Sequence, residues 1–168
     1  MVRVNVPVPG RAYDVVVGQG VIDQANSHLP EFPKAESAFV VADREVADRW
    51  FDRLAAGLAD RGWSCTMLTV PAGEEAKSLD VYRALLHQLA TQEAHRDDVV
   101  VALGGGAVGD LSGFVASTYM RGMPFVQVPT TLLAQVDAAI GGKTAVNLPE
   151  GKNLVGTFAQ PRAVLADV

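Results

Sequence analysis

The chain has 168 residues, of which 49% are hydrophobic and 20% charged, a composition typical of an ordinary globular domain that excludes a disordered tail. Nineteen acidic against fourteen basic residues give a net charge of −5, and Lys and Arg do not cluster, so no nucleic acid partner is expected. The single cysteine, Cys65, excludes a disulfide framework and a thiolate metal cage.

The first residues predict a β-hairpin. Residues 2–8 and 12–18 alternate apolar and polar side chains around Pro9 and Gly10. A signal peptide needs an unbroken apolar stretch, and polar residues and prolines interrupt this one. No apolar run approaches the ~20 residues of a membrane-spanning helix. We therefore expect a cytoplasmic protein without a membrane partner.

Strand and helix patterns alternate after the hairpin. A short helix is expected over 21–29, and a compact apolar strand over 38–42 ends at Asp43. The next helix shows one apolar face with a spacing of four residues, made of Val46, Trp50, Leu54 and Leu58.

The same strand–helix unit then recurs. A strand over 65–70 leads through a loop at 71–77 to a helix that Ser78 can cap. The residues expected to face inward from this helix are Leu79, Tyr82, Leu86 and Leu89. The run 99–103 is apolar on both faces, as a central parallel strand requires, and glycines separate it from a helix over 111–120.

Three further elements complete the pattern. They are a strand over 125–128, a helix over 130–139 that two threonines open, and a strand over 163–166. The order predicts an α/β fold with a Rossmann-like, mostly parallel sheet and an N-terminal β-hairpin, as one domain over 1–168. Because the chain stops two residues after its last strand, without a covering helix, a truncated protein is the favoured expectation.

A glycine-rich turn follows the central strand. Gly104, Gly106 and Gly109 have the spacing of a dinucleotide-binding turn between a strand and a helix. Glycine lets backbone amides approach a pyrophosphate at the positive end of the helix dipole. The alternative is that these glycines only make the turn tight. The motif lies in the third strand–helix unit and Asp110 follows it, which weakens the dinucleotide interpretation.

Polar residues follow two other strands of the predicted sheet. Asp43 would suit a ribose diol at the carboxyl end of its strand, or would simply cap the next helix. Glu74 and Lys77 follow the next strand at the same sheet edge, with solvated loop charges as the alternative interpretation.

Three of the four lysines lie in glycine-bearing segments. Lys143 follows a pair of glycines and Lys152 follows one. Glycine beside lysine is typical of a loop that presents amides and an ammonium group to an anion, so phosphate or carboxylate binding is predicted. A P-loop is excluded, because Asp137 stands where its first glycine is required.

Four linked motifs resemble those of the dehydroquinate synthase family, in the same order and spacing. They are Gly104 to Phe114, Gln127 to Asp137, Gly141 to Asn147 and Gly151 to Asn153. The resemblance covers most of the chain after residue 38. It implies conversion of the seven-carbon sugar acid phosphate DAHP to 3-dehydroquinate and phosphate in the shikimate pathway of aromatic amino acid biosynthesis. The family uses NAD+ as a recycled cofactor, together with a divalent metal, zinc or cobalt.

The resemblance also implies roles for individual residues. The cofactor-binding set is Asp43, Gly73, Glu74, Lys77, Gly105, Gly106, Gly109, Asp110, Thr130, Thr131, Lys143 and Lys152. The catalytic set is Asp137, Lys143, Lys152, Asn153 and Arg121, the last as a phosphate contact. Fixed cations would compensate the carboxylate and phosphate of DAHP and stabilise charge that develops during elimination.

Length is the one departure from the family. Family members are about twice as long, and the Glu and His side chains that bind their metal lie in a helical second domain. The resemblance therefore implies that this chain is the NAD-binding half, without metal ligands, inactive alone, and part of a homodimer in the full-length family. The alternatives are another sugar-phosphate cyclase, an enzyme like the glycerol or iron-containing alcohol dehydrogenases, and a non-catalytic nucleotide-binding module that docks onto a separate helical half.

Overall fold

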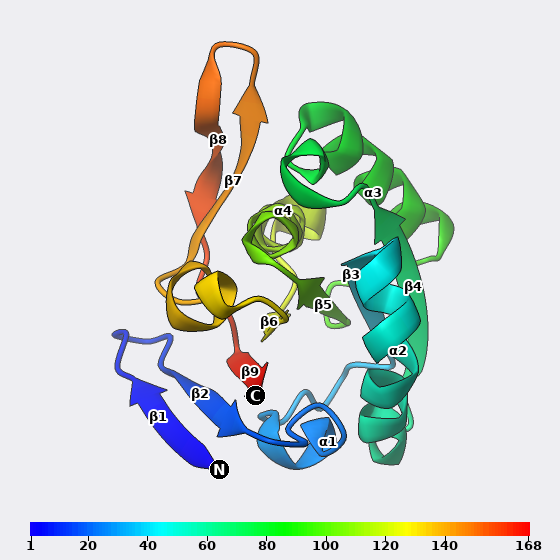
Figure 1. Cartoon of the computed structure of the whole chain (residues 1–168). Coiled ribbons are helices and arrows are strands. Elements are labelled where there is room, and N and C mark those ends of the chain that lie inside the picture. The colour runs from blue at the N-terminus through cyan, green and yellow to red at the C-terminus, as the bar shows by residue number, and fades with distance from the viewer.

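The computed structural model describes all 168 residues and contains a seven-stranded sheet, helices on both of its faces and a separate two-stranded ribbon (Figure 1). The strands of the sheet are β1 (Val2–Val6), β2 (Tyr13–Gly18), β3 (Ser37–Asp43), β4 (Ser64–Val70), β5 (Val99–Gly104), β6 (Phe125–Pro129) and β9 (Ala163–Asp167). The ribbon consists of β7 (Lys143–Leu148) and β8 (Gly151–Phe158). The helices are α1 (Ala25–His28), α2 (Arg44–Leu58), α3 (Leu79–Thr91) and α4 (Gly106–Thr118). Shorter helical turns are η1 (Ala59–Arg61), η2 (Gly73–Ala76), η3 (Tyr119–Arg121) and the π-helical η4 (Ala134–Ala138).

The sheet has the order β1-β2-β9-β6-β5-β3-β4, in which only β1 is antiparallel to its neighbour. Successive residues of β3 face opposite sides, so each face of the sheet has its own core. Val40 packs with Leu54 of α2 on one face, and Val41 packs with Leu111 of α4 on the other. The predicted α/β class, the parallel sheet and the N-terminal hairpin are confirmed.

Two helices begin at the predicted caps. The side chain of Asp43 accepts a hydrogen bond from the backbone N–H of Val46 at 3.0 Å, and Ser78 accepts one from Val81 at 3.2 Å. The inward face of α3 is partly wrong, because Leu79 is 45% exposed whereas Leu85 is fully buried. Leu79 precedes Leu85 by six residues, which places it about 120° away around the helix.

The helix predicted over 21–29 is shorter, and only Ala25–His28 is α-helical. The residues before it form a turn because both side-chain oxygens of Asp167 accept backbone hydrogen bonds, from Gly20 at 3.0 Å and from Ile22 at 2.9 Å. The helix expected over 111–120 starts earlier, at Gly106, and ends at Thr118.

The ribbon is the largest difference from the expected elements, because its two lysine-bearing segments were predicted as loops. Thr144 and Val146 of β7 are buried against α4, and Ala145 between them is less buried. The hydroxyl of Thr144 donates to the carbonyl of Thr157 across the ribbon at 2.8 Å. Figure 1 shows β7 and β8 standing beside α4, away from the plane of the sheet. None of the helices combines the length and the apolar character needed to cross a bilayer.

Candidate functional site

The strand order reverses between β3 and β5, so a ligand crevice is expected at the carboxyl ends of these two strands. From β3 the chain moves outward to β4, with α2 on one face, whereas from β5 it moves the opposite way to β6, with α4 on the other face. Open α/β sheets bind ligands in the crevice that such a reversal creates. Asp43 ends β3 and Gly104 ends the adjacent β5, so two segments predicted to bind the cofactor meet there.

The glycine-rich turn starts helix α4 at this crevice. No side chain caps the helix, so the backbone amides of its first turn are available to an anion. A Cβ atom at Gly104 would lie 2.9 Å from the Val108 side chain, and one at Gly109 would lie 2.8 Å from Oε1 of Gln127. Close packing therefore favours glycine at both positions, whether or not a ligand binds there. The prediction of anion binding rests on the uncapped amides.

Lys77 is the buried centre of a polar cluster beside α4. Its side chain is only 5% exposed, and Nζ donates to Oδ2 of Asp110 and to Oδ1 of Asn153, each at 2.5 Å. Burial raises the pKa of Asp110, and the hydrogen bond and charge of Lys77 partly oppose that rise. The alternative that Lys77 is a solvated loop charge is therefore wrong.

Glu74 lies at the exposed rim of the same cluster. Its Oε2 accepts a hydrogen bond from Nδ2 of Asn147 at 2.9 Å and lies 3.4 Å from Nζ of Lys152. The hydrogen bond from Asn147, followed by the charges of Lys77 and Lys152, lowers the pKa of Glu74. Glu74 therefore carries a negative charge between two lysines that come from different elements.

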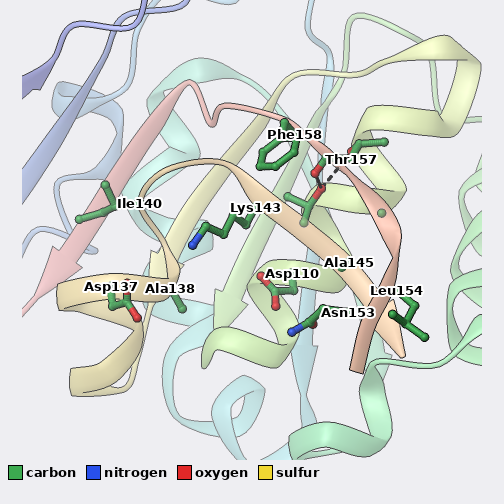
Figure 2. A pocket seen from close by; sticks show the side chains of 12 residues that line it. Asp110, Asp137, Ala138, Ile140, Lys143, Ala145, Asn153, Leu154, Thr157 and Phe158 are labelled. Atoms are coloured by element: carbon green, nitrogen blue, oxygen red, sulfur yellow. Dashed lines mark hydrogen bonds between the residues drawn. The ribbon is translucent and has the colours of Figure 1, made fainter. Parts of the chain in front are cut away.

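A cavity of about 440 Å³ lies between α4, η4 and the ribbon, next to this cluster (Figure 2). Four residues with predicted ligand roles line it together: Asp110, Asp137, Lys143 and Asn153. Lys143 enters from β7, Asp137 from η4 and Asn153 from β8. Figure 2 shows Asp110 and Asn153 side by side below the ribbon, with the Lys143 ammonium directed toward the side where Asp137 lies.

The two ribbon lysines lie on strands, so the prediction of loops around them is wrong. Lys143 begins β7 opposite Phe158, and Lys152 is the second residue of β8, with a side chain that is 72% exposed. Both nevertheless lie on the same side of the molecule as the start of α4. Lys143 shares the cavity with Asp110, and Lys152 pairs with Glu74.

Three other predicted cofactor contacts lie near the same sheet edge. The backbone N–H of Thr130 donates to the carbonyl of Gly104 at 3.0 Å, which joins the end of β6 to the end of β5. The hydroxyl of Thr131 accepts a hydrogen bond from Ala134 at 3.3 Å and so supports the start of the following turn. Gly73 begins η2 with a φ of +64°, directly before Glu74.

Arg121 is not brought together with these residues. It lies in η3, beyond the far end of α4, a helix of 13 residues and therefore about 20 Å long. There it lines a different cavity of about 580 Å³, together with Arg11, Arg96 and Arg162. Within one chain, Arg121 and Lys143 line separate cavities.

One residue at the centre of the cluster had no predicted role of its own. Asn147 bonds to Glu74 through its side chain and to Lys77 through its backbone. The motif Gly141 to Asn147 includes this residue, but its role depends on strand pairing that the sequence does not display.

The described chain contains no group of three or more His, Cys, Asp or Glu side chains arranged to hold a metal ion. The residues present therefore do not fit a divalent metal, and no reaction step in this chain is assigned to one.

Comparison with known proteins gives consistent results along the chain. A sequence model of the family described as 3-dehydroquinate synthase N-terminal matches residues 67–168. The 3-dehydroquinate synthase of Caulobacter vibrioides is 49% identical over 170 residues, covering 100% of this chain and 46% of the relative. That of Roseobacter denitrificans is 48% identical over 165 residues, covering 98% and 45%. The chain thus spans about half the length of the curated relatives it matches.

Solved structures share the fold. A 2-deoxy-scyllo-inosose synthase complexed with carbaglucose-6-phosphate, NAD+ and Co2+ matches with a TM-score of 0.91 and 31% identity, covering 99% of this chain and 46% of that one. A 2-epi-5-epi-valiolone synthase from Streptomyces hygroscopicus with bound NAD+ and Zn2+ matches with a TM-score of 0.77 and 35% identity, covering 92% of this chain and 42% of that one. A glycerol dehydrogenase from Schizosaccharomyces pombe matches with a TM-score of 0.70 and 22% identity, covering 91% of this chain and 36% of that one. At this identity the match shows a shared fold alone.

Proposed function

The chain belongs to the 3-dehydroquinate synthase family, and from this premise we propose that residues 1–168 form the NAD+-binding domain of an enzyme that converts DAHP to 3-dehydroquinate and phosphate. Because the chain spans 46% of the Caulobacter vibrioides relative, the proposal is for an enzyme in which a second segment closes the cleft and supplies the metal ligands. We propose a homodimer in the cytoplasm for that enzyme, as the family resemblance implies.

The observation that carries the proposal is the meeting of an uncapped helix start with a cluster of lysines. The first-turn amides of α4 lie at the crevice between β3 and β5, and Lys77, Lys143 and Lys152 lie on the same side of the molecule. Amides at a helix start suit a pyrophosphate, and Asp43 at the end of the neighbouring strand suits a ribose. These residues therefore fit NAD+.

The cavity beside this crevice suits a small phosphorylated acid. Bound NAD+ would supply reversible oxidation of a substrate hydroxyl. Lys143 and Lys152 would hold the carboxylate and phosphate of DAHP and compensate the charge that develops as phosphate leaves. Asp137 and Asn153, on opposite sides of the cavity, would orient the substrate between them.

Asp43 caps α2 and is proposed to bind the ribose of NAD+, and substitution can separate these two roles. Asn is as good an N-cap as Asp, whereas Ala is not, so Asp43→Asn should leave stability nearly unchanged and Asp43→Ala should lower the free energy of unfolding by about 1 kcal/mol. If Asp43 also binds the ribose, both variants should bind NAD+ about tenfold more weakly. Urea unfolding and NAD+ titration measure the two effects. An affinity that Asp43→Asn leaves unchanged would remove Asp43 from the cofactor site.

A chimera tests the proposed reaction. This chain would replace the matching N-terminal segment of the Caulobacter vibrioides enzyme, to which it is 49% identical. With DAHP, NAD+ and Zn2+, the chimera should release phosphate and 3-dehydroquinate in equal amounts, whereas this chain alone should release neither. A folded chimera that binds NAD+ but leaves DAHP unchanged would contradict the proposal.

The second candidate is another sugar-phosphate cyclase, which the 2-deoxy-scyllo-inosose synthase match favours through its TM-score of 0.91. The same chimera discriminates between the two candidates. Phosphate release from glucose 6-phosphate or from a heptulose 7-phosphate, and not from DAHP, would favour the other cyclase.

A further inference from the structure

A β-bulge interrupts the ribbon opposite Asn147. Val146 pairs with Val155 and Leu148 with Gly151, so the extra residues lie on β8 and Asn147 has no paired residue there in the strand register. Its backbone N–H donates instead to the carbonyl of Lys77 at 2.8 Å, and it forms an isolated bridge with Ser78. Bulges re-aim side chains and are frequent beside active sites. This bulge joins the ribbon to the segment between η2 and α3.

Both ends of the Asn147 side chain are used. Nδ2 donates to Oε2 of Glu74, and Oδ1 accepts from the backbone N–H of Asn153, each at 2.9 Å. Asn153 has a φ of +58°, a left-handed conformation that its surroundings must support. The side chain of Asn153 in turn accepts a hydrogen bond from Lys77. One residue thus holds three others that have proposed ligand roles.

We infer that Asn147 is a positioning residue of the NAD+ site, which fixes Glu74 and Asn153 relative to one another without touching the ligand. This inference rests on the proposed function. Without the carboxamide, Asn153 would lose the support for its left-handed backbone, and Lys77 would lose one of its two acceptors. The charged groups of Lys77 and Glu74 would then no longer be held in a single geometry.

The polarity of the bond to Glu74 provides a sharp test. Asn147→Asp keeps an acceptor for the Asn153 amide but places a carboxylate where Glu74 needs a donor. Adding Glu74→Gln restores a donor and acceptor pair with the direction reversed. If Asn147 is a positioning residue, Asn147→Asp should weaken NAD+ binding in the chain that retains Glu74. The same substitution should change NAD+ binding little in the chain that already carries Glu74→Gln. If the added charge instead acts directly on NAD+, Asn147→Asp should weaken NAD+ binding equally with Glu74 and with Glu74→Gln.

The experiment is a titration of the 168-residue chain and its variants with NAD+, under conditions in which urea unfolding shows each variant to be folded. Asn147→Asp should weaken binding about tenfold beside Glu74 and less than about twofold beside Glu74→Gln, as expected for side chains in one hydrogen-bonded network. Asn147→Ser, which is too short to bridge both partners, should also weaken binding about tenfold and serves if Asn147→Asp does not fold.

Asn5→Asp is the matched control, because Asn5 also donates to a carboxylate, that of Asp14 at 2.9 Å, on the edge strand β1. It should leave the affinity unchanged. Unchanged affinity in the Asn147 variants, or equal losses in both backgrounds, would overturn the inference alone. Failure of the unsubstituted chain to bind NAD+ would overturn the proposed function and the inference with it.

Discussion

Lys77→Met should lower the free energy of unfolding by about 3 kcal/mol near pH 8, because it leaves the carboxylate of Asp110 buried without its partner. The Lys77 side chain is 5% exposed and that of Asp110 is 20% exposed, so water compensates little of the loss. Urea unfolding of the variant and of the unsubstituted chain, at several pH values, measures it.

The sign of the pH dependence follows from the pKa of Asp110. Burial already raises this pKa above the ordinary value of an aspartate, and removal of Lys77 raises it further. A group whose pKa is raised in the folded state stabilises the fold below its unfolded pKa, and this contribution is lost as pH rises through the folded pKa. The penalty in Lys77→Met should therefore shrink as pH falls toward about 4.

A second substitution serves as the control for Lys77→Met. Asp110→Asn in the same chain removes the orphaned charge, so the double variant should recover at least half of the lost stability near pH 8. A loss that is independent of pH, or that Asp110→Asn does not relieve, would show that Lys77 stabilises the fold only by packing.

Gly156→Ala should separate the two strands of the ribbon. Gly156 pairs with Ala145, and a Cβ atom there would overlap the carbonyl oxygen of Thr144 and lie 2.7 Å from Cα of Ala145. Backbone atoms cannot rotate away, so the expected loss is about 3 kcal/mol or more in the free energy of unfolding. Because Lys143 lies on the displaced strand, the affinity for NAD+ should fall as well.

Gly151→Ala is the matched control on the same strand. The nearest atom to its added Cβ is Cδ1 of the flexible Leu154 side chain, at 3.3 Å. Stability should change by less than about 1 kcal/mol, in either direction. Equal losses in the two variants, or none in Gly156→Ala, would contradict the close approach of the strands.

The alternation of strands and helices could be predicted because apolar residues recur with a period suited to each element. The run 99–103, apolar on both faces, forms the interior strand β5, and Asp43 and Ser78 cap helices as expected. The remaining differences from the predicted elements come from contacts between residues that are distant in sequence. Asp167 bonds to the amides of Gly20 and Ile22 and so shortens the first helix.

The sequence identified most residues of the candidate site, but it predicted their arrangement only in part. The family resemblance assigned ligand roles to Lys77, Asp110 and Asn153, and the structure brings these three into one hydrogen-bonded cluster. The ribbon was missed because glycine beside lysine is equally compatible with a loop and with a tightly paired strand. Asn147 was missed because strand register depends on pairing partners that a single sequence does not identify.

The central claim is that NAD+ lies across the start of α4 and the cluster around Lys77. Amide resonances of the 15N-labelled chain, followed by NMR as NAD+ is added, test it most directly. We predict saturable shifts that are largest at Asp43, at 73–77 and at 105–110, and small at the cavity beyond the far end of α4 that Arg11 and Arg121 line. Shifts concentrated at that second cavity, or an absence of saturable shifts, would contradict the claim.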